Sequence, residues 1–363
     1  MHILHVIESL EFGGAEKVVV HLANRLIENN QISICLTKRE GPLVTELDQN
    51  IKVYFLDAGE GNNWSIPRQI KNIVTENAVD VIHSHNWSVY LETSIAALLL
   101  PKVRLIHTIH GKYMSYGSGL ASVLKIKIRH FLEFILSQRS FKIISVSDSI
   151  KKYIGREIGI WDKKCMTIRN GIKPIAFLDK TKVTQSTTRF VTVGRLARVK
   201  NQKLMILAFE NALIENKSIS LTLIGDGPER ENLEQLVNQL KITDHVNFLG
   251  FRDDASQLLA DYDVFLLSSD YEGVSIALLE AMSSGMPAIS TDVGGISETI
   301  VDSKTGLLVS QGDLSGYTSA MVKFINEKDM IDSMGKAANQ FFLNNFHEDL
   351  VIEQYHLIYS SNE

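Results

Sequence analysis

Residues 263–287 read Asp263-Val-Phe-Leu-Leu-Ser268-Ser-Asp-Tyr-Glu272-Gly-Val-Ser-Ile-Ala-Leu-Leu-Glu280-Ala-Met-Ser-Ser-Gly-Met-Pro287. The run Asp263–Ser268 predicts a buried strand of a parallel sheet, and Val274–Ser284 has the length and composition of the helix that follows such a strand. A strand, a short loop and a helix form the repeating unit of α/β proteins. This stretch therefore predicts an α/β domain.

Two carboxylates mark this unit. Glu272 falls in the loop, and Glu280 lies about two turns along the predicted helix, at roughly 3.6 residues per turn. Free N–H groups at a helix N-terminus attract anions, and here they belong to Gly273, Val274, Ser275 and Ile276. This arrangement suits a ligand with hydroxyls beside phosphate, such as a nucleotide sugar. The alternative is that Glu272 only balances the helix dipole and that Glu280 is solvated.

Length and composition favour two domains. A chain of 363 residues with 45% hydrophobic residues and 6 Pro is ordinary for an α/β protein with full cores. The chain starts with the apolar run Ile3–Ile7, without a basic segment or a small-residue cleavage site, so we expect no export signal. Cys35 and Cys165 make neither a disulfide framework nor a metal site. The expected location is the cytoplasm.

Strands and helices are predicted to alternate along the whole chain, the pattern of parallel sheets. The first group of predicted strands is Ile3–Ile7, Ile32–Thr37, Lys52–Leu56, Val79–His83, Arg104–Thr108, Lys142–Ser147 and Met166–Arg169. The second group is Phe190–Val193, Ser220–Ile224, Val246–Leu249, Val264–Leu267, Ala288–Ser290 and Gly306–Val309. Between the groups, hydrophobic density falls and Lys, Thr and Ser accumulate, which indicates a linker. We predict domains at 1–172 and 189–346, a linker at 173–188 and a final helix within 347–363.

Three further segments favour phosphate binding. Gly13 and Gly14 lie between the first strand and a helix predicted near Ala15, where glycines permit positive φ and close backbone approach. Arg195 and Lys200 share one loop after the first strand of the second domain, where they could hold both sides of a diphosphate. The third segment is Gly225-Asp-Gly-Pro-Glu229, and the glycines Gly294 and Gly295 are expected to act with it. A tight turn and solvated cations are the plain alternatives.

Histidines gather at strand ends of the first domain: His83, His85, His107 and His110. No carboxylate or cysteine completes a ligand set by spacing, so we predict no metal site. Asn170-Gly171 predicts a turn at the end of this domain.

Charge divides unevenly. We subtract the number of Asp and Glu residues from the number of Lys and Arg residues. The result is 21 − 16 = +5 for residues 1–172 and 16 − 26 = −10 for the rest, which sums to the net charge of −5. Within the cationic half, residues 120–136 mix Lys125, Lys127 and Arg129 with large apolar residues. One interpretation is a helix lying on an anionic membrane. The other is a crossover helix with a solvated basic edge.

Together these motifs, over residues 13–298, resemble the retaining glycosyltransferases related to glycogen and sucrose synthases, in their bacterial polysaccharide or glycoconjugate branch. The Gly-Arg-Leu…Lys-Asn element at 194–201 and the Glu-x7-Glu element at 272–280 carry the resemblance. It implies a GT-B fold, in which two Rossmann-like doubly wound parallel-sheet domains face a cleft and the final helix crosses back to the first domain. One departure is Val274-Ser275, where relatives often carry an aromatic residue followed by Gly or Pro.

The resemblance also implies roles. Glu272 would hold hydroxyls of the donor sugar, Glu280 the ribose, and Arg195 with Lys200 the diphosphate, while His110 would face the donor. Asn170 matches a turn beside the substrate. The resemblance thus implies retaining, metal-independent transfer without a cofactor, from a nucleotide diphosphate sugar to a glycan or lipid-linked glycan, with UDP-sugars favoured over GDP-sugars. An anionic membrane surface is a further expected partner and nucleic acid is not. A sugar-nucleotide epimerase and a non-enzymatic sugar-binding protein are the alternatives.

Overall fold

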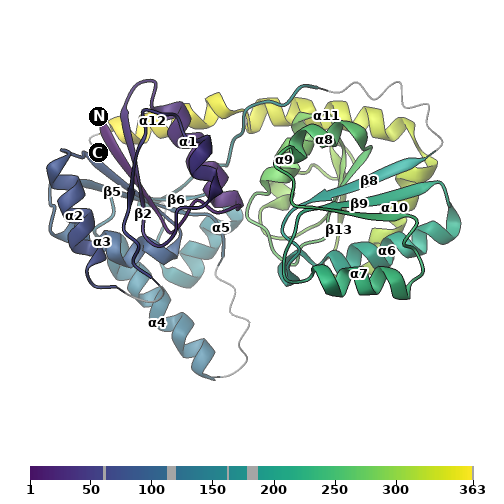
Figure 1. Ribbon diagram of the computed structural model, residues 1–363, viewed down its shortest axis with the longest axis horizontal. Coiled ribbons are helices and arrows are strands. Elements are labelled where there is room, and N and C mark those ends of the chain that lie inside the picture. Colours follow the sequence, from purple (N-terminus) through teal and green to yellow (C-terminus); the bar gives the residue numbers. More distant parts are fainter. Residues whose placement is uncertain (60–62, 113–119, 162, 178–186, 362–363) are drawn as a thin grey trace. The chain divides into compact units, whose positions relative to one another are not determined.

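The computed structural model describes residues 1–59, 63–112, 120–161, 163–177 and 187–361. The chain divides into two compact units (Figure 1): Met1–Asn170 packs with the segment that begins at Asp349, and Gly171–Glu348 forms the second unit. Much of the predicted linker, residues 178–186, lies outside the described residues. Its described part packs on the second unit, where the Ile175 N–H donates to Ser283 Oγ at 2.8 Å.

The described residues of the first unit form a sheet of seven parallel strands, in the order β3-β2-β1-β4-β5-β6-β7. Its strands are β1 (His2–Ile7), β2 (Gln31–Leu36), β3 (Lys52–Phe55), β4 (Val81–His85), β5 (Arg104–Ile109), β6 (Lys142–Ser145) and β7 (Cys165–Thr167). Its helices are α1 (Gly14–Leu26), α2 (Ile66–Glu76), α3 (Tyr90–Leu98), α4 (Leu120–Ser137), α5 (Asp148–Tyr153) and α12 (Glu348–Ser360).

Two hydrophobic clusters cover the faces of this sheet. One contains buried residues of α1 and α12 with Ile3 and Ile34, and the other contains residues of α2, α3 and α5 with Leu4 and Ile82. Side chains alternate between the faces of a strand, so Ile3 and Leu4 of β1 contribute to opposite clusters. Strands buried on both faces have nearly continuous apolar sequences, which is why β1 could be predicted.

The described part of the second unit holds six parallel strands, in the order β10-β9-β8-β11-β12-β13. They are β8 (Thr188–Val193), β9 (Ile219–Ile224), β10 (Val246–Gly250), β11 (Val264–Leu267), β12 (Ala288–Thr291) and β13 (Gly306–Val309). Its helices are α6 (Gln202–Glu215), α7 (Arg230–Gln239), α8 (Ala255–Leu258), α9 (Ile276–Ser283), α10 (Leu314–Asn326) and α11 (Asp329–Asn345). Helices α6, α7 and α10 line the main core on one face of the sheet (Figure 1).

The doubly wound α/β architecture is thus confirmed, and all thirteen predicted strands are present among the described residues, with ends that differ from the prediction by up to two residues. Strand β4 starts at Val81 instead of Val79 and reaches His85, because its pairing with β5 continues to His85 opposite Thr108. Helix α9 starts at Ile276 instead of Val274. The cause is local: Ser275 is extended, and its hydroxyl accepts from the Leu278 N–H at 3.3 Å, which makes it the N-cap.

Candidate functional site

The strand order of the second unit defines where a ligand would bind. Strand β8 lies between β9 and β11, so the chain moves from β8 towards one edge of the sheet and then returns to pair β11 on the other side of β8. Ligands of open α/β sheets bind at such a switch point, beyond the carboxyl ends of the strands. The loops that follow β8 and β11 flank this point, and they carry Arg195, Lys200 and Glu272.

Two of the predicted residues are directly paired. The Lys200 ammonium forms an ion pair with Glu272 Oε1, which also accepts from Ser269 Oγ at 3.1 Å. The side chains of Lys200 and Glu272 are 26% and 12% exposed, so water screens this pair less than it screens a surface pair. A cation that was expected to hold phosphate and a carboxylate that was expected to hold sugar thus neutralise each other in the ligand-free protein.

Further hydrogen bonds join these two loops. Asn201 has a left-handed backbone (φ 46°) and caps α6, while its amide donates to Asp270 Oδ1 at 3.0 Å. Ser268 Oγ lies 3.0 Å from the carbonyl oxygen of Lys200 and 2.9 Å from that of Asn201. The Lys200–Glu272 pair therefore rests on a fixed backbone, which is what a site that orients a ligand requires. Sequence reasoning missed Asp270 and Ser269, although they adjoin Glu272 in the same loop.

Arg195 differs from Lys200. It is exposed, and its guanidinium has no hydrogen-bond partner in the described part of the chain, while its carbonyl accepts from Gln202 at 3.0 Å. A planar fork of donors on a fixed loop is suited to a bidentate contact with phosphate.

The glycine-rich loops approach their neighbours closely. A Cβ on Gly225 (φ 139°) would lie 2.0 Å from the carbonyl oxygen of Gly194, so the loop after β9 packs against the start of the Arg195 loop. A Cβ on Gly294 (φ 57°) would lie 1.8 Å from the carbonyl oxygen of Glu272, to which the Gly295 N–H donates at 3.1 Å. Glycine at 294 therefore lets the loop after β12 support the backbone of Glu272.

The residues at the start of α9 are buried, namely Gly273, Val274, Ser275 and Ile276. Because α9 starts at Ile276, Glu280 lies only a little more than one turn into the helix, at about 3.6 residues per turn, and not two. It is half-buried. The shorter separation keeps Glu280 near the carboxyl edge of the sheet.

The remaining predicted residues belong to the first unit. Helix α1 begins at Gly14, and Gly13 precedes it with an extended backbone (φ −156°), so Gly13 does not use the positive φ that glycine permits. A Cβ on Gly13 would lie 2.1 Å from Glu16 Oε2, at the end of a side chain of the same helix. Asn170 is buried at the end of the unit.

Four histidines of this unit, His5, His83, His85 and His110, form one cluster on β1, β4 and the end of β5. The predicted His107 is not hydrogen-bonded to them: its Nδ1 lies 2.9 Å from Ser84 Oγ and its ring stacks on Tyr90. His5 Nδ1 lies 3.0 Å from His85 Nε2, and His85 Nδ1 lies 3.1 Å from His110 Nε2. His83 bonds instead to Tyr359 of α12 at 2.6 Å and to Thr108 at 2.7 Å. His5 escaped sequence reasoning, because its neighbours in the cluster come from other strands.

Burial governs the protonation of the cluster. It lowers the pKa of His5 to about 3 and that of His110 to about 4, and it lowers the pKa values of His83 and His85 well below 6.5, with neighbouring histidines adding to the shift. Desolvation disfavours the charged imidazole. At neutral pH these rings are therefore uncharged, and each carries a single N–H.

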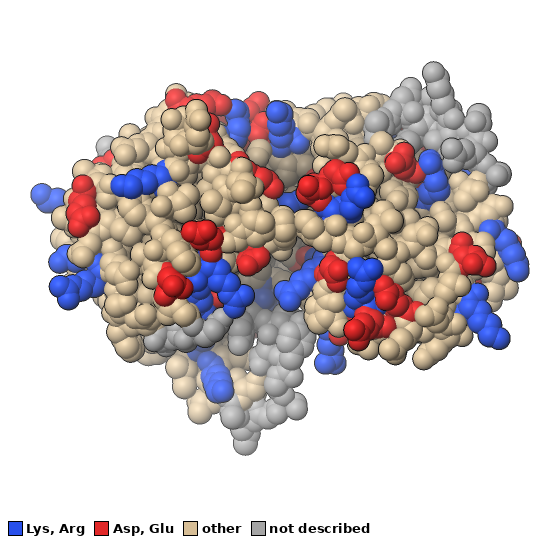
Figure 2. Space-filling view, in the orientation of Figure 1, with Lys and Arg blue, Asp and Glu red and all other residues tan. Residues whose placement is uncertain are grey.

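Helix α4 exposes apolar side chains, although it is a crossover helix between the paired strands β5 and β6. Phe131 is 64% exposed. Other apolar side chains of the helix are exposed to a smaller fraction, among them Val123, Leu124, Ile128, Phe134 and Ile135. Arg129 is paired with Glu133 at 3.1 Å and lies over the ring of Trp87, which leaves Lys125 and Lys127 as the exposed cations of the helix. On the face that Figure 2 shows, Lys and Arg are interspersed with Asp and Glu. None of the described helices has the length and apolarity needed to cross a bilayer.

Comparisons with known proteins agree with this architecture. Residues 12–174 match the family model described as Glycosyltransferase Family 4, and residues 177–341 match the one described as Glycosyl transferases group 1. The chain is 27% identical over 305 residues to N-acetyl-alpha-D-glucosaminyl L-malate synthase of Bacillus anthracis, covering 81% of this chain and 78% of that protein.

Two further matches cover nearly the whole chain. The Escherichia coli UDP-Gal:alpha-D-GlcNAc-diphosphoundecaprenol alpha-1,3-galactosyltransferase is 25% identical over 342 residues, covering 88% of this chain and 87% of that enzyme. The structure of HepE from Anabaena in complex with UDP has the same fold, with a TM-score of 0.82 at 20% identity and 98% of both chains covered. Because the two family models match 12–174 and 177–341 in succession, the chain belongs to the group 1 and family 4 glycosyltransferases, and its fold is GT-B.

Proposed function

We propose that this glycosyltransferase moves a sugar, with retention of its anomeric configuration, from a UDP-sugar to a glycan or lipid-linked glycan in the synthesis of a polysaccharide or glycoconjugate. The E. coli relative is named for a UDP-Gal donor and a diphosphoundecaprenol-linked acceptor, and HepE binds UDP. Both names support a uridine nucleotide here, and the first supports a lipid-linked acceptor.

The ion pair between Lys200 and Glu272 carries this proposal. A diphosphate at the switch point would compete with Glu272 for Lys200 and would add a contact to the exposed Arg195. Glu272, released from Lys200, would then accept hydrogen bonds from sugar hydroxyls. Binding of the nucleotide would thus prepare the carboxylate that holds the sugar.

The chemistry follows from these charges. The bond between the anomeric carbon and the diphosphate oxygen breaks, the acceptor oxygen bonds to that carbon, and the acceptor proton passes to the leaving phosphate. Negative charge grows on the diphosphate as the bond breaks, so Arg195 and Lys200 stabilise the transition state more than the ground state.

We further propose that the reaction needs no divalent metal. The Asp-x-Asp spacing in the second unit, at Asp261 and Asp263, precedes β11 at the amino edge of the sheet. Asp263 is buried and is held by Arg189, whose guanidinium donates to both of its carboxylate oxygens at 3.1 and 3.0 Å. Asp263 therefore serves the fold, and in this proposal the charge of the diphosphate is balanced by Arg195 and Lys200.

A panel of UDP-, GDP- and ADP-sugars in a thermal-shift assay tests the donor. We expect UDP-sugars to raise the midpoint most. NMR of the product made from the best donor then gives the anomeric configuration, and an inverted product would contradict the proposal. Turnover of the donor without an acceptor would instead favour an epimerase, and binding without turnover would favour a sugar-binding protein.

A further inference from the structure

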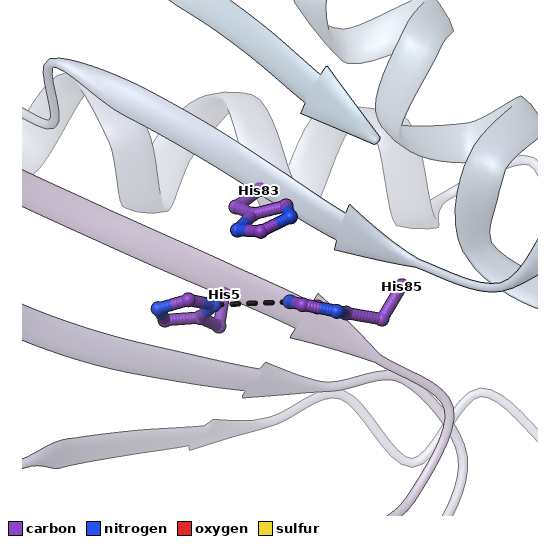
Figure 3. A group of neighbouring side chains, drawn as sticks. All are labelled: His5, His83 and His85. Carbon is purple, nitrogen blue, oxygen red and sulfur yellow. Dashed lines mark hydrogen bonds between the residues drawn. The ribbon is translucent and has the colours of Figure 1, made fainter. Parts of the chain in front are cut away.

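Three histidines form a continuous chain of hydrogen bonds across the first sheet. Figure 3 shows His5 and His85 joined, with His83 beside them. His85 uses both ring nitrogens, Nε2 towards His5 at 3.0 Å and Nδ1 towards His110 at 3.1 Å. The two nitrogens at the ends of the chain, His5 Nε2 and His110 Nδ1, are buried and have no hydrogen-bond partner among the described residues.

Neutral imidazoles allow two proton arrangements in such a chain, because each ring has one N–H and each N···N contact needs one donor and one acceptor. In the first arrangement His5 donates to His85, His85 donates to His110, and His110 Nδ1 carries a proton. In the second arrangement every bond is reversed, so His5 Nε2 carries a proton and His110 Nδ1 is an acceptor. The tautomer of His110 is therefore coupled to that of His5, two rings away.

A substrate oxygen that reached His110 Nδ1 would favour the first arrangement. A buried N–H without a partner costs free energy, and orphaned N–H groups are rarer than orphaned acceptors. In the second arrangement that N–H is at His5 Nε2, in the interior of the sheet. In the first it is at His110 Nδ1, where an oxygen of a bound sugar nucleotide could accept from it.

We propose that His85, supported by His5, is a positioning residue that holds His110 in the Nδ1–H tautomer, so that His110 donates a hydrogen bond from Nδ1 to the substrate. This inference rests on the role proposed for His110 in glycosyl transfer. His83 is outside the chain, since its two nitrogens are engaged by Tyr359 and Thr108.

A metal ion is the rival explanation for the cluster. One nitrogen from each of His5, His83 and His85 lies within 4.8 Å of the others (Figure 3). Both nitrogens of His85 and both nitrogens of His83 are already hydrogen-bonded, so a cation there would break one hydrogen bond of each of these two rings. No carboxylate belongs to this group to offset its charge. The described contacts therefore favour the proton chain.

Two amide variants of His85 test the proposal. Asparagine places its amide near the position of Nδ1 and keeps a donor towards His110, whereas glutamine places its amide near Nε2 and keeps only the contact to His5. We expect His85→Gln to shift His110 to the Nε2–H tautomer and to lower kcat about tenfold, the scale of one hydrogen bond. His85→Asn should retain the Nδ1–H tautomer and most of the activity. If His85 had only a structural role, His85→Asn would lose more activity than His85→Gln, because asparagine leaves the larger cavity.

The tautomer is read by two-bond ¹⁵N–¹H NMR of histidine-labelled protein with and without UDP, and His110→Phe assigns the signal. An Nε2–H tautomer in the UDP complex, or the same spectrum in both His85 variants, would overturn the proposal, and so would a stoichiometric metal found by mass spectrometry. Because this readout needs no turnover, the expected spectrum with no transfer from any UDP-sugar would instead refute the proposed function.

Discussion

Glu272 and Lys200 are each other's partners before any ligand binds, and this changes what a mutation at either position measures. In Glu272→Ala the sugar loses its carboxylate while Lys200 is freed for the diphosphate. We expect turnover to fall by about 10²-fold or more, with UDP bound as tightly as before or more tightly. Initial rates and calorimetric titration with UDP check this expectation.

Glu280→Ala provides the comparison. If Glu280 holds the ribose, its loss should weaken UDP binding by about 1.5 to 3 kcal/mol, the cost of one charged hydrogen bond. Glu272→Gln keeps the shape of the side chain without the charge and should resemble Glu272→Ala in turnover. Activity of Glu272→Ala within a few-fold of the parent would remove Glu272 from the mechanism.

The cations of the β8 loop give a second prediction. Arg195→Ala and Lys200→Ala should each lower kcat/KM by about 10²-fold, the scale of roughly 2.7 kcal/mol for one lost oxyanion donor. Lys200→Arg should restore only part of the activity, because a planar fork cannot replace a compact ammonium opposite Glu272. Initial rates in saturating EDTA belong to the same experiment and should equal those without it.

Arg198 is the matched control, since it is an exposed cation of the same loop with no role in the proposal. Arg198→Ala should leave kcat/KM nearly unchanged. Loss of activity in EDTA that Mg²⁺ restores, together with near-normal Arg195→Ala and Lys200→Ala, would exclude the proposed role of the two cations.

At the scale of elements, the loops at the carboxyl edge of the second sheet hold one another in place through glycines. Gly294→Ala would drive a Cβ to 1.8 Å from the Glu272 carbonyl oxygen, so the Glu272 loop must move. A displacement of about 1 Å at a reacting group costs roughly 10²-fold in rate. We therefore expect Gly294→Ala to lower kcat by that factor.

Gly312→Ala is the control that distinguishes backbone strain from displacement of the Glu272 loop. The φ of 75° at Gly312 is also left-handed, but no heavy atom lies within 4 Å of the position of its Cβ. Gly312→Ala should cost the backbone penalty alone, about 1 to 2 kcal/mol of the free energy of unfolding, without loss of kcat. Equal kcat values for the two alanine variants would show that Gly294 does not position Glu272.

The same loops show what the sequence could predict. The thirteen strands could be read from short apolar runs because parallel strands are buried on both faces. The first residue of α9 could not be predicted, because Val274 continues the apolar pattern and only the Ser275 cap decides the boundary. Arg195, Lys200 and Glu272 could be singled out by type and spacing. Their pairing could not be predicted, because Lys200 and Glu272 are far apart in the chain and meet only through the strand order.

At the scale of the whole molecule, the buried histidines should make stability depend on pH. Burial lowers the pKa of His5 and of His107 to about 3, below the usual 6.5. Below pH 6.5 the unfolded chain therefore binds protons that the folded protein excludes. Stability is complete above pH 6.5 and falls as the pH decreases, by up to about 1.4 kcal/mol per histidine and pH unit.

Chemical denaturation at pH 7.5, 6.5 and 5.5 measures this effect. Glu16 and Glu133 oppose it at lower pH, because burial raises the pKa of each carboxyl and the folded protein then binds the extra proton. His5→Asn should reduce the pH dependence of the free energy of unfolding by the contribution of one histidine. A free energy of unfolding that stays constant from pH 7.5 to 5.5 would contradict the prediction.

The remaining question for the whole molecule is whether it attaches to a membrane. Helix α4 joins the exposed apolar residues Ile128 and Phe131 to the exposed cations Lys125 and Lys127, which is the composition of an interfacial helix. We propose that α4 lies on anionic lipid, where a lipid-linked acceptor would be found.

Sedimentation with vesicles at low salt should show binding to anionic but not to neutral lipid, and the double variant Phe131→Ser with Ile128→Ser should bind anionic vesicles more weakly. Leu357→Ser removes a similarly exposed side chain from α12, 65% exposed against 64% for Phe131, and should leave the binding unchanged. Equal and negligible sedimentation with both kinds of vesicle would mean that α4 serves only as the crossover between β5 and β6.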